Sequence, residues 1–315
     1  MRRSFGQLSL ADGLVSARSG SLDRIAGLVD WPALDALMSG IHSAVAGRPG
    51  YGPLVLLRCV FLQQWYGLSD PGLEEALADR LSFRRFVGLS LSDPVPDHST
   101  LSRFRKVLVE QRLGERLLAE VNRQLAEKGL ILKRGTLVDA SLIAANARRP
   151  RQSELKEERS DRDASWNAMP DDSPHYGYKA HVAVDQDSGL VRQAILTPAN
   201  VSDRTPAPDL IQGDEQAFYA DKGYDGWWLS AKLAERGIAD RIMRPNYRRR
   251  PLTPEDKVRN KQIAAVRYQV ERAFAVLKQW YGYSRVRYRS LQRNSLQLQF
   301  LCIAMNLRRA VVLAG

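Results

Sequence analysis

The sequence predicts an α/β protein with a mixed sheet flanked by helices, preceded by an all-helical N-terminal domain. Apolar residues follow helical spacing over residues 20–125, and short β-rich runs replace that pattern after residue 130. Strands and helices then alternate, as in a sheet covered by helices. With 315 residues, 44% of them apolar, the chain can bury cores in more than one domain. We expect a helical DNA-binding domain at 1–130 and an α/β catalytic domain at 131–315.

The helical region contains a candidate DNA-reading element. Helices are expected after Pro53, after Asp70 as a cap with Pro71 in the first turn, and after a cap at Asp97 or Ser99. The third helix has three basic residues on its expected exposed side: Arg103, Arg105 and Lys106. A short helix, a turn and a helix rich in Ser, Thr and Arg are compatible with a helix-turn-helix, and equally with helices that only pack. Arg103 and Arg105 are therefore candidate DNA contacts.

The α/β region is predicted to hold five strands and three helices. In order they are strands at 135–143, 178–185 and 190–196, a helix at 206–212, a strand at 217–221, a helix at 227–236, a strand at 241–243 and a long helix at 261–280. The turn Asp187-Ser188-Gly189 joins the second and third strands. Polar residues of mixed charge at about 144–177 predict a loop or mobile insertion.

The positive charge is concentrated in one segment. The chain carries 47 Lys and Arg against 35 Asp and Glu, a net charge of +12. Between Arg241 and Arg293 there are 15 basic and 3 acidic residues, so this segment holds the whole excess. Aromatic residues are interleaved with it, and the combination favours a nucleic-acid partner over a merely solvated surface. Arg248 and Arg249 are candidate phosphate contacts within this segment.

Several classes of protein are excluded by what the sequence lacks. Two cysteines cannot build a disulfide framework or a cysteine zinc cage, and four histidines are few for a His-rich metal site. No Walker loop is present, so the chemistry is not driven by a nucleotide. No secretory segment and no run of about 18 apolar residues is visible, so we expect a cytoplasmic protein without a membrane span. Both cysteines lie in apolar runs, which predicts buried free thiols.

Two carboxylates, Asp139 and Asp221, lie at positions that indicate a functional role in addition to a structural one. Asp139 lies inside an apolar strand, where Asp is disfavoured and an unpaired buried charge is costly. Asp221 ends a short apolar strand, and ligands gather at the carboxyl ends of strands in open α/β sheets. For Asp221 a turn or helix cap is the alternative. Asp203 and Asp225 follow turn signals, and capping explains both of them adequately.

A third carboxylate, Glu271, belongs to the long predicted helix. At about 100° per residue, Arg267, Glu271 and Lys278 fall at roughly 0°, 40° and 20°, and so form one polar stripe. The same spacing places the core face on Val266, Val270, Ala273 and Leu277, beside the stripe. A simple i, i+4 ion pair between Arg267 and Glu271 is the alternative explanation.

Together the three carboxylates predict a divalent-metal site. Hard oxygen ligands suit Mg²⁺ or Mn²⁺. Two such ions about 4 Å apart can activate a water and stabilise the leaving oxygen of a phosphodiester. Carboxylates combined with a basic segment therefore indicate phosphoryl chemistry on nucleic acid.

The sequence resembles the DDE transposases of bacterial insertion sequences, and most closely the insertion-sequence-five-like group. The resemblance extends from about residue 45 to 300. The group usually has a Tyr three residues before the Arg of its helix signature, where this chain has Ala264. The order Asp, Asp, Glu matches, and so do these segments: Leu137-Val138-Asp139-Ala140-Ser141, Tyr219-Ala220-Asp221-Lys222-Gly223-Tyr224-Asp225, Arg267-x3-Glu271-x6-Lys278, and Pro96 to Arg105 in the helical part.

The resemblance implies a ribonuclease H-like fold, with Asp139 on the first strand, Asp221 on the fourth and Glu271 on the last helix. It implies that these three residues bind two Mg²⁺ or Mn²⁺ ions and catalyse cleavage at transposon ends. The freed 3′-hydroxyl would then attack target DNA, and synapsis of two ends suggests at least a homodimer. Arg267 and Lys278 would contact phosphate near the scissile bond, and Lys222 could assist them.

Two other functions remain open at this stage. A domesticated transposase that binds DNA without cutting is disfavoured, because a binding protein gains nothing from mutually repelling carboxylates. A metal-dependent nuclease without strand transfer cannot be separated from a transposase by sequence. Lys179 and His181 are weaker candidates for the site, since alternation along a strand can simply point them at solvent. Of the tryptophans, Trp280 is expected to pack, and Trp227-Trp228 is expected to anchor a helix on the sheet.

Overall fold

The computed structural model describes residues 20–41, 50–151, 155–167, 174–248 and 250–315. The chain forms two compact units, one from residues 1–124 with 307–315 and the other from residues 125–306. Two helices, α8 (Leu113–Glu127) and α12 (Leu291–Leu313), run from one unit into the other. Residues 307–315 therefore belong with the helical unit, although the sequence assigned them to the α/β domain.

The first unit is helical, as predicted. Its core is built around aromatic rings: Trp31 and Trp65 each contact both Phe61 and Phe86, at centroid distances of 5.5–6.2 Å. Such pairs add about 0.5–1.5 kcal/mol each beyond the burial of their area. The guanidinium of Arg58 lies 4.3 Å from the Trp31 ring. The described helices are α2 (Ser21–Leu28), α3 (Trp31–Leu37), α4 (Pro53–Tyr66), α5 (Asp70–Asp79), α6 (Leu81–Val87) and α7 (His98–Glu110), with the start of α8.

Local capping fixes where α5 and α7 begin. Asp97 caps α7 by accepting the Thr100 N–H at 2.6 Å, and these hydrogen bonds lower the pKa of its carboxyl to about 2. At α5 the cap is Ser69, which accepts the Gly72 N–H at 3.1 Å, and Asp70 is the first helical residue. The sequence had assigned the cap to Asp70. Its carboxylate is instead engaged with side chains of α4 and α7.

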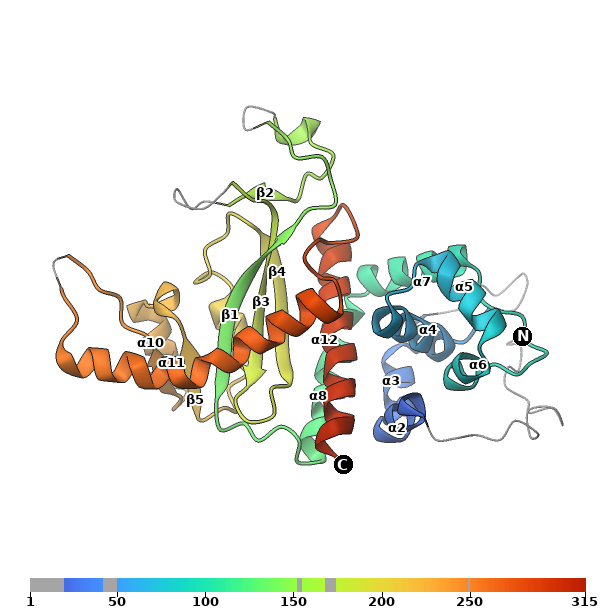
Figure 1. Cartoon of the computed structure of the whole chain (residues 1–315), viewed down its shortest axis with the longest axis horizontal. Coiled ribbons are helices and arrows are strands. Elements are labelled where there is room, and N and C mark those ends of the chain that lie inside the picture. The colour runs from blue at the N-terminus through green and yellow to red at the C-terminus, as the bar shows by residue number, and fades with distance from the viewer. Residues whose placement is uncertain (1–19, 42–49, 152–154, 168–173, 249) are drawn as a thin grey trace. The chain divides into compact units, whose positions relative to one another are not determined.

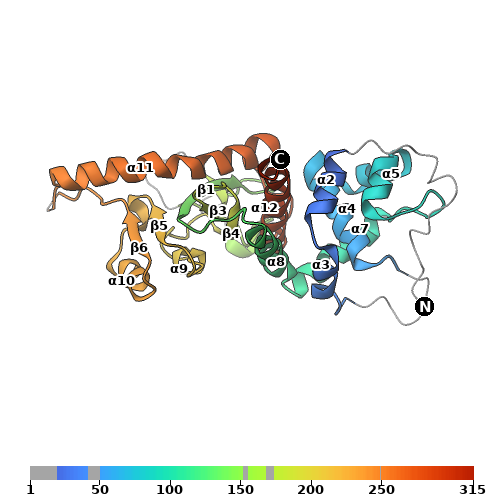
Figure 2. The same ribbon diagram turned by 90° about the horizontal axis from the view of Figure 1, so that it is seen from below.

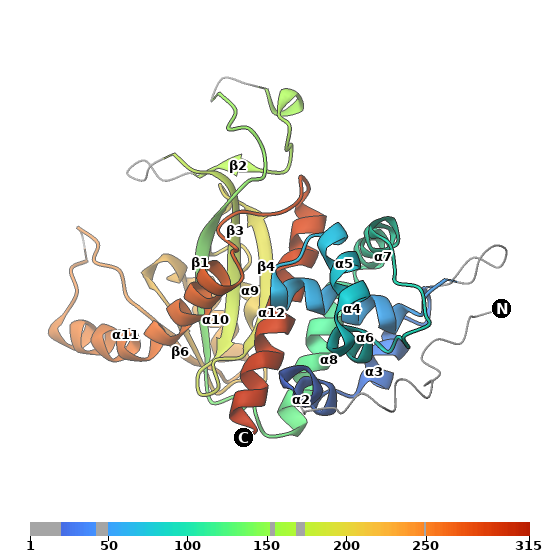
Figure 3. The same cartoon turned by 45° about the vertical axis from the view of Figure 1, so that its right-hand side comes forward.

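The second unit is built on a mixed sheet whose main strands have the order β4-β3-β1-β5-β6 (Figures 1 and 3). β1 pairs antiparallel with β3 and parallel with β5, β3 pairs antiparallel with β4, and β5 pairs parallel with β6. This is the ribonuclease H-like arrangement that the sequence predicted. The strands are β1 (Thr136–Ala144), β3 (Tyr176–Asp185), β4 (Val191–Pro198), β5 (Ala217–Ala220) and β6 (Ala239–Ile242).

The two neighbours of β1 are joined to it over very different lengths. The antiparallel ladder with β3 runs from Thr136 to Ala144, the full length of β1. The parallel ladder with β5 holds only two pairs, and it ends at Leu137 opposite Tyr219. Beyond that pair β1 and β5 are no longer hydrogen-bonded to each other. The sheet therefore opens between these strands just before Asp139 and Asp221.

Helices cover both faces of the sheet (Figure 2). On one side, α9 (Ala207–Leu210) and α10 (Trp227–Glu235) pack on a cluster that includes Val138, Ala183 and Phe218. On the other side runs α11 (Pro254–Ala275). Its buried residues are Ile263, Val270, Ala273 and Phe274, so the core face predicted from spacing is largely confirmed, although Val266 is only half-buried.

α11 differs from its prediction at both ends. It begins at Pro254, earlier than predicted, because Thr253 and Asp256 form a capping box with hydrogen bonds of 3.1 and 3.3 Å. After Ala275 the chain continues as one π-helical turn, η3 (Val276–Trp280). A π turn is wider than an α turn, so it changes the direction in which Lys278 projects from the α-helical value.

The predicted insertion at about 144–177 is partly ordered into the fold. It contains a 3₁₀ turn, η1 (Lys156–Glu158), and a short strand, β2 (Ser165–Trp166), which pairs with the start of β3. Asp161 is almost fully buried and anchors the segment, because its carboxylate accepts the Tyr178 hydroxyl at 2.8–2.9 Å. Residues 152–154 and 168–173 lie outside the described chain.

Two exposure predictions for tryptophan were wrong. Trp280 is 77% exposed and Trp227 is 84% exposed, whereas Trp228 packs on the core cluster as expected. Both cysteines are buried free thiols, as predicted.

Among the described residues, one helix, α12, has the length and composition to cross a membrane. In the fold 72% of its most apolar stretch is buried, and core helices of soluble proteins have the same properties. A single helix of this kind is weak evidence for a span.

Candidate active site

Asp139 and Asp221 lie at the opening between β1 and β5. Asp139 is on β1, two residues after the last pair with β5, and Asp221 directly follows the end of β5. Asp221 also caps the short turn η2 (Lys222–Tyr224), because its Oδ1 accepts the Gly223 N–H at 2.8 Å. The capping role foreseen as an alternative for Asp221 is thus real, and it leaves Oδ2 of the same carboxylate outside that bond.

The carboxylate of Asp139 is half-buried and electrostatically strained. Burial raises its pKa to about 6, and the nearby carboxylates of Asp221 and Glu271 act in the same direction. Two contacts oppose the shift: the Arg267 guanidinium at 3.2 Å from Oδ2, and the Ala140 N–H, which donates to Oδ1 at 2.9 Å. The charges of Asp221 and Glu271 therefore both act on the carboxyl of Asp139.

Glu271 comes from α11, on the same face of the sheet as Arg267. It is exposed, whereas the Arg267 side chain is only 12% exposed. The predicted i, i+4 pair does not describe Arg267, because its guanidinium reaches across to Asp139 on β1. Glu271 therefore has no ion pair with Arg267 and faces solvent. Asp139, Asp221 and Glu271 are called the acidic group below.

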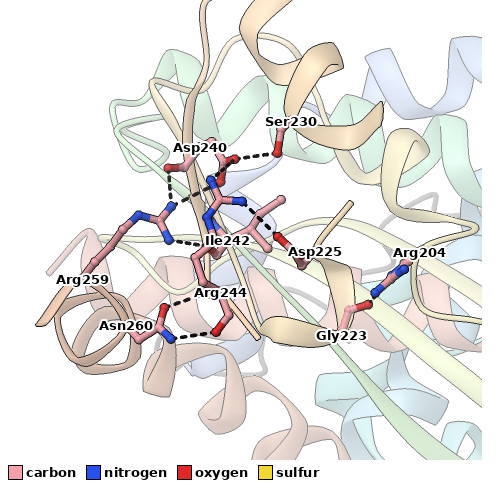
Figure 4. Close-up of polar contacts among 9 residues, drawn as sticks. All are labelled: Arg204, Gly223, Asp225, Ser230, Asp240, Ile242, Arg244, Arg259 and Asn260. Atoms are coloured by element: carbon pink, nitrogen blue, oxygen red, sulfur yellow. Dashed lines mark hydrogen bonds and ion pairs between the residues drawn. The ribbon is translucent and has the colours of Figure 1, made fainter. Parts of the chain in front are cut away.

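A polar network fixes the start of α11 against the carboxyl end of β6 (Figure 4). Arg259 of α11 donates to the Ile242 and Asp240 carbonyls at 2.6 and 3.0 Å, and its guanidinium pairs with the Asp240 carboxylate at 3.5 Å. Asn260 exchanges two hydrogen bonds with the backbone of Arg244, at 2.8 and 2.9 Å. The register of the helix that carries Glu271 is therefore set by contacts some three turns away.

Asp225 belongs to this network and not to the acidic group. Its Oδ1 pairs with Arg244 at 3.0 Å, and Arg244 also reaches Asp240 (Figure 4). Asp203 pairs with Lys179 at 2.7 Å. Lys179 and His181 do not point at solvent: Lys179 is mostly buried, and His181 is fully buried, with Nε2 at 2.9 Å from Thr197 Oγ1.

The oxygen chemistry of the acidic group suits a hard divalent cation. Among the residues that the structure describes, no group of three or more His, Cys, Asp or Glu side chains is arranged so that it could hold a metal ion by itself. A cage is not needed for Mg²⁺, which keeps several waters and binds one or two carboxylates together with substrate phosphates. Asp139, Asp221 and Glu271 fit that mode, because their mutual repulsion at Asp139 is relieved by a cation.

The predicted DNA contacts fall into different settings. Lys222 and Arg248 are exposed, and Lys278 is half-buried, which lowers the pKa of its ammonium. Arg249 lies outside the described residues. In the helical unit, Arg103 is exposed and donates to Ser99 and Thr100 of its own helix.

Arg105 was expected on the exposed side of α7, and this was wrong. Its guanidinium bonds Asp70 and also Gln63, at 3.1 Å from Oε1, and the side chain is only 14% exposed. Arg105 ties α7 to α4 and α5, so its charge is already used within the unit.

Sequence reasoning missed Tyr224, which lies in the η2 turn after Asp221. Its ring is 1% exposed, and its hydroxyl is buried without a hydrogen-bond partner in the part of the chain that the structure describes. The carboxylates of Asp203, Asp139 and Asp221 all act on it. The sequence signal for Tyr224 was its place in the segment Asp221-Lys222-Gly223-Tyr224-Asp225, where the charged residues are more conspicuous.

A ribonuclease H-like sheet with carboxylates at the opening beside its first strand indicates an enzyme that acts on nucleic acid. Sequence comparison makes the assignment narrower. The transposase DDE domain matches residues 131–307, and a second transposase domain, DUF772, matches residues 10–107. The chain belongs to the DDE transposase family.

Solved transposase structures show remote similarity. The chain is 10% identical to the piggyBac transposase in its synaptic complex with hairpin DNA, covering 93% of this chain and 72% of that one, with a TM-score of 0.46. It is 11% identical to a chain of the pre-cleavage Mos1 transpososome, covering 89% and 85%, with a TM-score of 0.20. The family assignment stands on the sequence match.

Proposed function

We propose that this transposase binds the ends of an insertion sequence of the insertion-sequence-five-like group, cleaves them, and joins the 3′-hydroxyl ends to target DNA. The observation that supports the proposal is that the charges of Asp221 and Glu271 both act on the carboxyl of Asp139 at the opening beside β1. Two Mg²⁺ or Mn²⁺ ions held there would supply an activated oxygen nucleophile and stabilise the leaving oxygen of the phosphodiester.

The chain's own residues would prepare the site for this chemistry. Asp139 would supply oxygens from within β1, Asp221 from the end of β5, and Glu271 from α11. Arg267 neutralises Asp139 in the structure, at 3.2 Å. Cation binding would take over that task and leave the guanidinium free to bind a phosphate near the scissile bond. Lys278 and Lys222 would add positive charge along the DNA backbone.

The remaining parts of the proposal concern partners. The basic segment from Arg241 to Arg293 would hold double-stranded DNA, with Arg248 and Arg249 on phosphates, and the helical unit would contribute Arg103. Two transposon ends have to be brought together for joining, so the active form would be a homodimer. The protein would act in the bacterial cytoplasm, on the nucleoid.

A supercoiled plasmid that carries the gene with its flanking DNA tests the proposal. With Mg²⁺, the wild-type protein should yield products in which element ends are joined to new DNA. Asp139→Asn, Asp221→Asn and Glu271→Gln should each abolish cleavage while still shifting end DNA in a gel. Glu235→Gln, an exposed carboxylate on α10, is the matched control and should cut normally.

The same assay separates the two other functions. Nicks without joined products would identify a nuclease that lacks strand transfer. Shifts of end DNA without any cleavage by the wild-type protein would identify a binding protein. Full cleavage by all three carboxylate variants would remove the acidic group from catalysis.

A further inference from the structure

A buried polar cluster lies behind the acidic group, on residues that the proposed chemistry does not use. It consists of Tyr224, Asp203, His181 and Lys179. Among the described residues, three of its atoms are buried without a hydrogen bond: Tyr224 OH, Asp203 Oδ1 and His181 Nδ1. Asp203 Oδ1 is 2.7 Å from Lys179 Nζ, an ion pair whose angles do not make a hydrogen bond. A buried polar atom left unpaired is costly, so the two atoms of the cluster with neither a hydrogen bond nor an ion pair, Tyr224 OH and His181 Nδ1, require an explanation.

Tyr224 is the member of the cluster that faces the acidic group. Its ring packs in the core with Val138 and Phe218, which fixes the direction of its hydroxyl. The charges that act on the phenol are those of Asp203 first, then Asp139 and Asp221, and together with burial they raise its pKa well above the usual value. The group therefore stays protonated and is an unused hydrogen-bond donor on which these carboxylates act.

The other members hold Asp203 in place. Lys179 donates to the Val201 carbonyl at 2.9 Å while it pairs with Asp203, so the loop after β4 is tied to β3. Burial lowers the pKa of His181 to about 4, so the imidazole is neutral at pH 7. With one neutral ring, one paired carboxylate and one phenol, the cluster has the donors and acceptors that a buried water requires.

We propose that Tyr224 is a positioning residue of the acidic site: its hydroxyl, backed by Asp203, donates through a buried water to the Asp139–Asp221 pair and holds these carboxylates in the orientation that binds divalent ions. The proposal rests on the proposed function for the identity of the site. It explains why a hydroxyl is kept at a position where a phenylalanine ring would fill the same core without an unpaired atom. Groups behind a metal's ligands commonly change metal affinity or activity about 10–100-fold.

Tyr224→Phe tests the proposal, with Tyr283→Phe as its matched control. Tyr283 is also 1% exposed, and its hydroxyl is also buried without a partner, but the titratable group that acts on it is Cys302 and no carboxylate. Both variants remove one oxygen from an equally buried ring. Calorimetric titration with Mn²⁺ in the absence of DNA gives a readout independent of catalysis, and the melting temperature reports on folding.

Tyr224→Phe should bind Mn²⁺ about tenfold more weakly than wild type, with cleavage reduced in parallel and a melting temperature equal to or above that of wild type. Tyr283→Phe should bind Mn²⁺ as wild type does. Unchanged Mn²⁺ affinity in Tyr224→Phe, or an equal loss in Tyr283→Phe, would overturn the proposal.

The experiment also decides the role of Tyr224 in two further cases. If Tyr224→Phe lowers the melting temperature more than the control does, Asp203→Asn decides: weaker Mn²⁺ binding supports the positioning role, and unchanged binding overturns it. If wild type binds Mn²⁺ but does not cut DNA, the proposed function fails while the comparison of the two tyrosine variants still decides the role of Tyr224.

Discussion

At the residue scale, the sequence singles out Asp139, Asp221 and Glu271 as candidates, but it does not give their contacts. Asp139 was conspicuous because a carboxylate interrupts an apolar strand, and its half-buried setting follows from that pattern. The ion pair between Arg267 and Asp139 could not be predicted from the sequence. Helical spacing gives the direction of a side chain around its own axis, whereas this ion pair depends on how α11 lies on β1. The unpaired hydroxyl of Tyr224 was hidden for the same reason.

The raised pKa of Asp139 predicts a pH-dependent stability. The native carboxyl keeps its proton up to about pH 6, against an ordinary value of 3.8, so the native state binds more protons than the unfolded state between these values. Raising the pH through this window therefore removes stability from the wild-type protein. Asp139→Asn lacks the titration, so its stability relative to wild type should increase by about 2 kcal/mol between pH 4 and pH 7.

Urea denaturation of both proteins, at several pH values and without divalent ions, measures this difference. Because only its change with pH is compared, the constant cost of leaving Arg267 without its partner cancels. A stability difference that stays the same from pH 4 to pH 7 would show that Asp139 titrates normally in the fold.

At the scale of elements, apolar periodicity located every main strand and the long helix, and it failed at their ends. α11 begins at Pro254 because of a capping box at Thr253, a signal present in the sequence but not used. Its π turn could not be predicted, since nothing in local composition marks a wider turn. The exposure of Trp280 follows from that failure: regular α-helical angles placed this ring on the packed side.

The anchor of α11 gives a prediction at the same scale. Arg259→Ala removes two hydrogen bonds to strand carbonyls and the ion pair with Asp240, and hydrogen bonds to charged groups each contribute about 1.5–3 kcal/mol. The variant should lose about 3 kcal/mol of stability, the lower end of the sum for the two hydrogen bonds. It should also show faster amide hydrogen exchange in the first half of α11. Lys261→Ala, an exposed position on the same helix, should change neither quantity, and equal behaviour of the two variants would disprove the anchoring role.

At the scale of the whole molecule, charge and chain order predicted a helical unit, a catalytic unit and a basic segment. They did not predict that residues 307–315 belong with the first unit. α12 is a continuous apolar helix, and its sequence does not reveal which core each of its turns joins. The concentration of positive charge between Arg241 and Arg293 is read directly from the sequence, and binding experiments test whether DNA is the partner of this segment.

The charge distribution predicts how DNA binding responds to salt. Arg248→Ala combined with Arg249→Ala removes two candidate phosphate contacts, so affinity for DNA should fall at low salt. The slope of log K against log salt should become less steep by up to roughly 2, since each contact contributes about 0.9. Lys128→Ala, an exposed lysine outside the basic segment, serves as the control. An unaltered slope in the double variant would place Arg248 and Arg249 outside the interface.

The central claim is that Asp139, Asp221 and Glu271 hold divalent ions together. Titration of Mn²⁺ followed by electron paramagnetic resonance, which detects the free ion, tests it without DNA or turnover. Asp139→Asn, Asp221→Asn and Glu271→Gln should each bind Mn²⁺ at least about tenfold more weakly than wild type, while Glu235→Gln binds normally. If the three variants bind Mn²⁺ as tightly as wild type, the carboxylates do not form a metal site and the account is contradicted.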